Sequence, residues 1–228
     1  MVMSPDGKML YVFVQEGHAE LMVPVLASSG AMGHAVTLPD STDQPAGIDP
    51  FTVAVGDNEM IYVASWGVDG NSSQVYSIDA LSGSLEKATS VAYKVDGLKV
   101  SADGRDLWAT GEDNTYGSDG PRALILISLP GMKIVRETSL VPTPEGLAVD
   151  PSGRVVFVSG DDNRVDVIDT GTGRVEASLR TSAILDNSPG GDMQEASGIV
   201  LSPDGKTLYA VNGSGKIAVR SVGGYTGH

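Results

Sequence analysis

The chain contains no cysteine among its 228 residues. This absence excludes disulfide bonds and metal sites built from thiolates. It is compatible with a reducing compartment and with an oxidising one. Aromatic residues make up only 5% of the chain and histidine occurs three times, so acid–base groups other than carboxylates are scarce. No apolar run is longer than a strand, so the sequence predicts no transmembrane helix.

Basic residues are also few. The chain has 15 Lys and Arg against 29 Asp and Glu, which gives a formal net charge of −14. Such a charge argues against binding to nucleic acid or to an anionic membrane surface. Two interpretations of the acidity stay open: solubility, or a site for a cation or a basic partner.

What the sequence does contain is a repeated phrase, Ser-Pro-Asp-Gly-Lys followed by a short apolar run. The copies begin at Ser4, Ser101, Asp150 and Ser202, and a degraded copy spans residues 55–63. The turn positions are 46 to 52 residues apart and fall at Gly7, Asn58, Gly104, Gly153 and Gly205. This period accommodates about four short strands and their turns, which is typical of β-propeller blades.

The phrase itself predicts a hairpin turn. Asp-Gly between two apolar runs is a strong hairpin signal because the turn needs a residue with positive φ. Asn58 replaces the glycine in the degraded copy, and Asn tolerates the left-handed region next best. The clearest repeat has four predicted strands, at residues 145–150, 155–159, 164–169 and 173–179.

We therefore predict an all-β chain with one domain over residues 1–228, a β-propeller of about five four-stranded antiparallel blades. The expected blades span residues 1–39, 50–93, 96–141, 145–181 and 197–222. Five aromatic residues share one position of the repeat, and we expect them to pack as wedges between blades: Tyr11, Tyr62, Trp108, Phe157 and Tyr209.

These residues resemble the YVTN β-propeller repeat family. The best matches are Leu10-Tyr11-Val12, residues 167–170 (Val-Ile-Asp-Thr) and residues 172–175 (Thr-Gly-Arg-Val). The second repeat, residues 62–85, is similar instead to the lactonase-type seven-bladed propellers related to 6-phosphogluconolactonase and cycloisomerases. The resemblance implies a fold rather than an activity, because this fold serves many functions.

Both families usually have seven blades, whereas this chain has material for five. Three arrangements follow: a small five-bladed ring, a piece of a larger propeller, or a ring completed by another chain. The closed five-bladed ring is favoured here. An open arrangement would expose sheet edges and apolar faces and so promote self-association. The sequence shows no signal peptide, which would have a charged start followed by an apolar segment, so we expect a mature or trimmed chain. We expect the protein outside the cytoplasm: secreted, periplasmic or at the cell surface.

Acidic and amide residues gather in the loops that lead into the first strand of each repeat and in the loops between the second and third strands. Their oxygen atoms suit a hard cation such as Ca²⁺, although Asp and Asn are also ordinary turn formers. The candidate metal ligands are Asp113, Asp119, Asp161 and Asp162. None of them matches a calcium loop with its terminal Glu.

The other candidate residues lie at the same end of the predicted propeller, which we call the loop face because it carries these loops. A catalytic site would combine His18, Arg122 and Glu145, although three ordinary surface residues would show the same pattern. Candidate ligand-binding residues are Trp66, Asp69, Tyr116, Asp192 and Glu195. No Gly-x-Ser-x-Gly, phosphate-loop or dinucleotide motif is present.

Three functions are compatible with these features. The leading one is a non-catalytic binding or scaffold module that meets a protein or small-molecule ligand on its acidic loop face. The alternative is a lactonase-like hydrolase or lyase that uses the loop face with a divalent cation. The third is a propeller subunit of a redox complex, because amine-dehydrogenase heavy chains have similar propellers.

Overall fold

The computed structural model describes residues 1–16, 19–38, 48–56, 59–66, 71–113, 115, 120–129, 131–140, 143–160, 164–180, 198–211 and 217–227. These residues form nineteen strands in five antiparallel sheets and one four-residue helix, α1 (Gly223–Thr226). The predicted all-β propeller class is confirmed. In this part of the chain, no helix has the length and apolar character needed to span a bilayer.

Each sheet is one blade, and the strands of a blade follow one another in chain order. Blade 1 contains β1 (Val2–Met3), β2 (Met9–Glu16), β3 (Ala19–Leu26) and β4 (Val36–Thr37). Blade 2 contains β5 (Ile48–Val55), β6 (Met60–Trp66), β7 (Ser73–Asp79) and β8 (Leu85–Val91). Blade 3 contains β9 (Lys94–Val100), β10 (Asp106–Glu112), β11 (Arg122–Ser128) and β12 (Lys133–Leu140). Blade 4 contains β13 (Pro144–Val149), β14 (Val155–Gly160), β15 (Arg164–Asp169) and β16 (Val175–Arg180). Blade 5 has three described strands, β17 (Ile199–Leu201), β18 (Thr207–Val211) and β19 (Ile217–Ser221).

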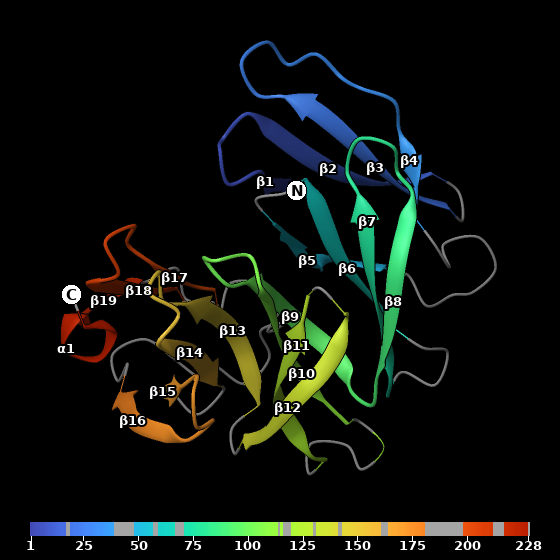
Figure 1. Ribbon diagram of the computed structural model, residues 1–228. Helices are drawn as coiled ribbons and strands as arrows, with labels where there is room; N and C mark the ends of the chain where they lie inside the picture. The colour runs from blue at the N-terminus through green and yellow to red at the C-terminus, as the bar shows by residue number, and fades with distance from the viewer. Residues whose placement is uncertain are drawn as a thin grey trace, which may run out of the picture.

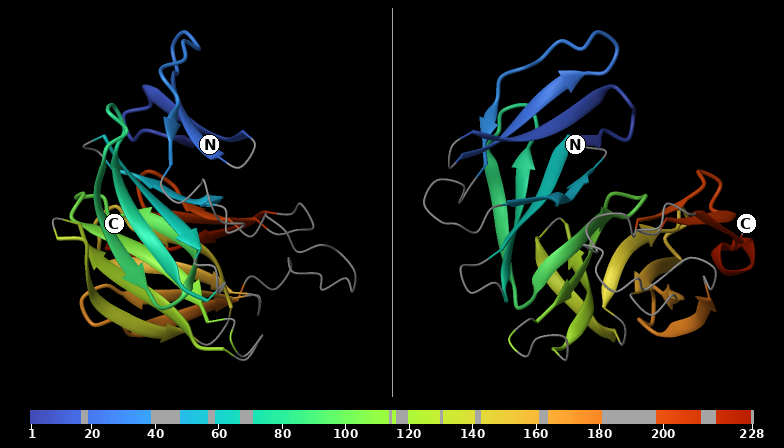
Figure 2. Two further views of the ribbon diagram at one scale, coloured as in Figure 1. Left: turned by 90° about the vertical axis from the view of Figure 1, so that its right-hand side faces the viewer. Right: turned by 180° about the vertical axis from the view of Figure 1, so that it is seen from behind.

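The first strand of every blade is its innermost one. β1, β5, β9, β13 and β17 contact one another in turn, and the later strands of each blade lie farther out (Figures 1 and 2). We call the end where the first strands begin the loop face, and the end that carries the Ser-Pro-Asp-Gly turns the turn face. Because strands alternate in direction, each second strand ends and each third strand begins at the loop face.

The repeated phrase forms the same hydrogen-bonded turn in blades 1, 3 and 5. In blade 1, the Ser4 hydroxyl donates to Asp6 Oδ1 at 2.7 Å and accepts from the backbone N–H of Met9 at 2.9 Å. Asp6 Oδ1 also accepts from the Lys8 N–H at 3.0 Å, and Gly7 has a φ of 70°. The aspartate therefore builds its own turn, as the sequence predicts.

The degraded copy makes a different turn from the one expected. Asn58, the predicted left-handed residue, lies outside the described residues. Glu59 has a φ of 61°, and the Gly56 N–H donates to the Met60 carbonyl, four residues on. In blade 1 the equivalent bond runs over five residues, from Ser4 to Met9. Blade 2 thus has a turn one residue shorter.

Apolar side chains between adjacent blades form the core. Tyr11 of blade 1 packs with residues of blade 2, and Phe157 of blade 4 packs with residues of blade 5. Tyr62 and Trp108 make the corresponding contacts between blades 2 and 3 and between blades 3 and 4. The prediction of aromatic wedges is therefore confirmed at four positions.

At the fifth position the prediction of a wedge between blades is wrong. Tyr209 of blade 5 is 37% exposed, because no described blade covers its face of the sheet. Among the described residues, no hydrophobic cluster joins blade 5 to blade 1. Instead of the favoured closed ring, the two blades form the ends of an arc (Figure 1).

Candidate functional site

Four of the twelve residues proposed from the sequence lie within the part of the chain that the structure describes. The other eight lie outside the described residues: His18, Asp69, Tyr116, Asp119, Asp161, Asp162, Asp192 and Glu195. Trp66 ends β6 and Glu145 lies near the start of β13, and only their backbone positions are described. Arg122 and Asp113 are described in full, at the loop face of blade 3.

Blade 3 presents a row of alternating charge where its strands reach the loop face. Lys94 of β9 lies opposite Glu112 of β10, and Glu112 lies opposite Arg122 of β11. Opposite charges on directly facing positions stabilise a sheet modestly. The row puts a carboxylate between two cations at the rim of the sheet.

A β-bulge in β9 adds a second carboxylate. Gly97 pairs with Thr110 and Val95 pairs with Gly111, so Asp96 between them has no opposite residue. Asp96 forms an ion pair with Lys94 at 3.1 Å, with both side chains about a quarter exposed. Bulges often re-aim side chains near functional sites, and this one turns Asp96 toward its neighbour at the rim.

Tyr93 completes this surface from the connection between blades 2 and 3. Burial raises the pKa of its phenol, and the negative charges of Glu137 and Asp113 raise it further. Gly111 makes the approach possible, because a Cβ there would lie 2.9 Å from the Cβ of Tyr93. The ring is thus held beside carboxylates. We call the six residues around this point the blade 3 rim: Tyr93, Lys94, Asp96, Glu112, Asp113 and Arg122.

Buried hydroxyl groups hold the rim in place. The Val95 N–H donates to Ser73 Oγ at 2.9 Å, and the Thr52 hydroxyl donates to the Val95 carbonyl at 3.5 Å. Ser73 and Thr52 both belong to blade 2 and are buried. These bonds hold the start of β9 against the neighbouring blade, so the backbone that carries the rim residues is fixed in place.

Asp113 serves the local backbone. Its Oδ1 accepts from the N–H of Thr115 at 2.9 Å, which is the turn-forming role of an aspartate. Among the described residues, no three Asp, Glu or His side chains are grouped closely enough to hold a metal ion. The Ca²⁺ site stays a prediction, because the other three candidate ligands lie outside that part of the chain.

A cavity of about 310 Å³ lies at the opposite end, near the turn face. The ends of β1, β5 and β9 line it, mainly with apolar side chains and backbone. Lys99 is the one ionisable residue in its lining. This lining suits a small apolar group and offers no acid–base pair.

Sequence reasoning placed Asp113 and Arg122 on the loop face but missed Tyr93, Lys94 and Asp96. A faint signal was present, since Lys94 and Asp96 flank the start of a predicted inner strand. The sequence does not show that a bulge and a glycine would bring these residues together beside Glu112.

Comparisons with known proteins support the fold. No family model matches the chain, and no curated protein matches it. Among solved structures 1240 chains match, and a fold so common carries little information on activity. One of them is a chain of hydrazine synthase from Kuenenia stuttgartiensis, with a TM-score of 0.74 and 19% identity. The match covers 96% of this chain and 70% of that one. At this identity the likeness shows the β-propeller fold alone.

Proposed function

We propose that the protein is a β-propeller binding module that holds a positively charged protein segment on its acidic loop face, with the blade 3 rim as part of the contact. The observation that carries the proposal is the rim itself. There, the negative charge of Asp113 acts on the phenol of Tyr93, and Asp96 and Glu112 lie on the two adjoining strands of a rigid sheet. The resemblance to YVTN repeats and the extracytoplasmic location stay predictions beside it.

Electrostatics favour such a partner. A net charge of −14 raises the association rate of cationic ligands and repels anionic ones. Carboxylates bind Lys and Arg side chains directly, and an aromatic ring binds them through the cation–π interaction. The rim combines both kinds of group within one surface.

Isothermal titration of the full chain with an oligolysine peptide tests the proposal, with an oligoglutamate peptide of equal length as the reference. We expect oligolysine to bind, more weakly at physiological than at low ionic strength, and oligoglutamate not to bind. The double variant Glu112→Gln/Asp113→Asn should weaken binding about five-fold, because partly exposed charges each contribute a fraction of a kcal/mol.

The matched control is Glu86→Gln/Glu176→Gln, which removes two exposed carboxylates from the outer strands of blades 2 and 4. Equal weakening in the control would show a general effect of charge and would remove the rim from the proposal. Turnover of a simple lactone by the wild-type chain would overturn the non-catalytic proposal. Loss of that turnover in His18→Ala and Glu145→Gln would support the lactonase-like alternative.

A further inference from the structure

We infer that the two end faces of the arc are blade–blade interfaces, and that each binds the other end of a second copy of this chain, head to tail. We call the face of blade 5 turned away from blade 4 the C-end face. We call the face of blade 1 turned away from blade 2 the N-end face. Neither face belongs to the blade 3 rim, so the inference is independent of the proposed function.

One position of the repeat is buried in the interior blades and exposed in blade 5. The wedge aromatic of each blade lies on the face turned toward the next blade. In blades 1 to 4 the wedge is almost fully buried, and in blade 5 it is not. The exposed fractions are 2% for Tyr11, 4% for Tyr62, 3% for Trp108, 0% for Phe157 and 37% for Tyr209.

The partner surface of a wedge is also repeated. Tyr11 packs against a face containing Ile61 and Val63 of blade 2, and Trp108 packs against one containing Val156 and Val158 of blade 4. In each case the two aliphatic residues flank the receiving blade's own wedge position. These four partner side chains are fully buried or within 1% of it. The contact is therefore a regular one: an aromatic wedge enters an aliphatic face.

The C-end face carries the wedge half of this contact. Val200, Tyr209 and Val219 lie directly opposite one another across the three strands of blade 5. All three side chains are exposed, and Ile217 beside them is exposed too. An apolar row in this register matches what the interior blades bury.

The N-end face carries the receiving half. Leu10 and Val12 of β2 flank Tyr11, as Val156 and Val158 flank Phe157. Val25 lies opposite Leu10 and Val23 lies opposite Val12. None of these four is buried, whereas all of their counterparts in blades 2 and 3 are. In blade 4 three of the four counterparts are buried, and the fourth is the partly exposed Asp166. Met3 and Val14, on the same face, are exposed outright.

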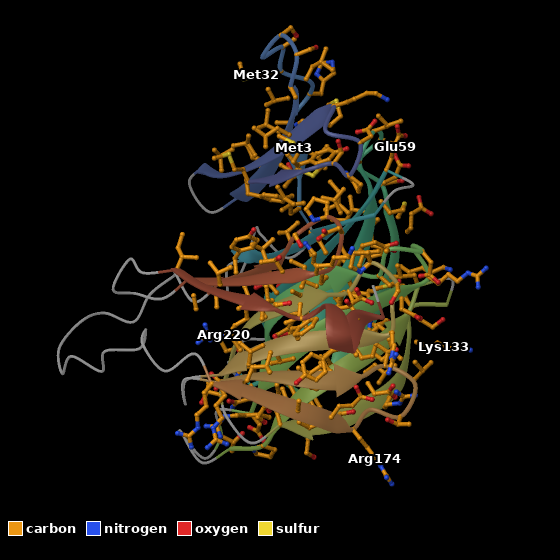
Figure 3. All side chains as sticks on the ribbon, turned by 90° about the vertical axis from the view of Figure 1, so that its left-hand side faces the viewer. Met3, Met32, Glu59, Lys133, Arg174 and Arg220 are labelled. Carbon is orange, nitrogen blue, oxygen red and sulfur yellow. The ribbon has the colours of Figure 1, made fainter. Side chains whose placement is uncertain are left out.

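The two halves cannot meet within one copy, because they lie at opposite ends of the arc. Figure 3 views the molecule from the open side, with Met3 and Met32 on blade 1 and Arg220 on blade 5. A second copy supplies the missing half to each face. The residues named on both faces are uncharged, so the contact places no like charges directly opposite each other, although each chain has a net charge of −14.

A contact between two different faces is heterologous. It therefore closes into a ring or continues as a chain of copies. This property gives a sharp test by sedimentation velocity over a range of concentrations. We expect the wild-type chain to associate, with a mass that rises with concentration.

Two double variants each disable one face at side chains that are already exposed. Val200→Lys/Val219→Lys alters the C-end face, and Met3→Lys/Val14→Lys alters the N-end face. Each variant alone should be monomeric, because a head-to-tail contact needs both faces. A mixture of the two should form a complex of two copies and nothing larger, because one intact face of each kind remains.

The control is Val135→Lys/Val175→Lys, which changes two similarly exposed valines on the outer strands of blades 3 and 4. It should associate like the wild type. Circular dichroism melts verify that each variant is folded. Ile217→Lys replaces a C-end variant that is not folded. Met32→Lys replaces such an N-end variant, because Met32 is exposed and lies opposite Val25 on the N-end face. A monomeric wild type, association of either variant alone, or no complex in the mixture would each overturn the inference.

Discussion

At the scale of single residues, one hydrogen-bonded device recurs, and its variation in blade 4 is instructive. In blades 1, 3 and 5, Ser donates to Asp two positions later. In blade 4 the order is inverted: Asp150 stands at the serine position and Ser152 at the aspartate position. The Ser152 hydroxyl still donates to Asp150, and it accepts from the Arg154 N–H as the aspartate does elsewhere. The turn thus requires a hydroxyl–carboxylate bond rather than a particular order.

Aspartates of this kind stabilise the fold in their ionised form. Hydrogen bonds lower the pKa of Asp103, first from Ser101 and then from the Arg105 backbone, and they lower the pKa of Asp204 in the same way. A pKa that is lower in the folded state gives stability above the unfolded pKa of about 4. This stability is lost as the pH falls through the folded value.

We therefore expect the melting temperature of the wild type to fall on acidification below about pH 4. The double variant Asp103→Asn/Asp204→Asn should lose part of this pH dependence, because its side chains no longer titrate. Thermal melts at neutral and acidic pH measure both. Identical pH profiles for variant and wild type would contradict the role given to these carboxylates.

At the scale of elements, the turns that join strands use glycine for two reasons. Gly104 and Gly83 have nearly the same φ, 67° and 72°. A Cβ on Gly104 would meet open space, whereas one on Gly83 would lie 2.6 Å from Cγ1 of Val36. Gly104 is needed only because its φ is positive. Gly83 is needed for the same reason and also because a side chain there would collide with Val36 of blade 1.

The substitution Gly104→Ala should cost about 1–2 kcal/mol of unfolding free energy, the penalty for a left-handed alanine. Gly83→Ala should cost more, by about 1–3 kcal/mol, because it overpacks the contact with Val36. Urea denaturation of both variants measures the difference. Equal losses would mean that Val36 moves aside without cost.

At the scale of the whole molecule, stability comes from the contacts between blades. A wedge aromatic is buried where another blade follows it, so its energetic contribution depends on whether that blade is present. Phe157 and Tyr209 occupy the same position of the repeat, and only Phe157 is covered. Comparing substitutions at these two residues therefore separates the contribution of the neighbouring blade from that of the local sequence.

Phe157→Ala should reduce the unfolding free energy by about 3–5 kcal/mol, as for a large aromatic removed from a core. Tyr209→Ala should cost about 1 kcal/mol or less in the monomer, because one face of the side chain meets solvent. Chemical denaturation at low protein concentration gives both values. A large loss from Tyr209→Ala in a verified monomer would show that its face is covered.

The fold was predictable to a large extent because its determinants are local. The turn chemistry of Asp6 and Gly7 and the alternation within strands specify hairpins, and the repeat period specifies blades. The site was predictable only in outline. Asp113 and Arg122 follow from the positions of loops, but the approach of Tyr93 and the bulge at Asp96 depend on contacts between strands.

The class of fold, the number of repeats and the turn at each repeat follow from the amino-acid sequence, because all three depend on residues close together in the chain. That the blades form an arc instead of a closed ring became evident from the packing of the blades. The same packing leaves Tyr209 exposed while its four counterparts are buried. A wedge has no partner within its own repeat, so its burial depends on a neighbour that the repeat does not encode.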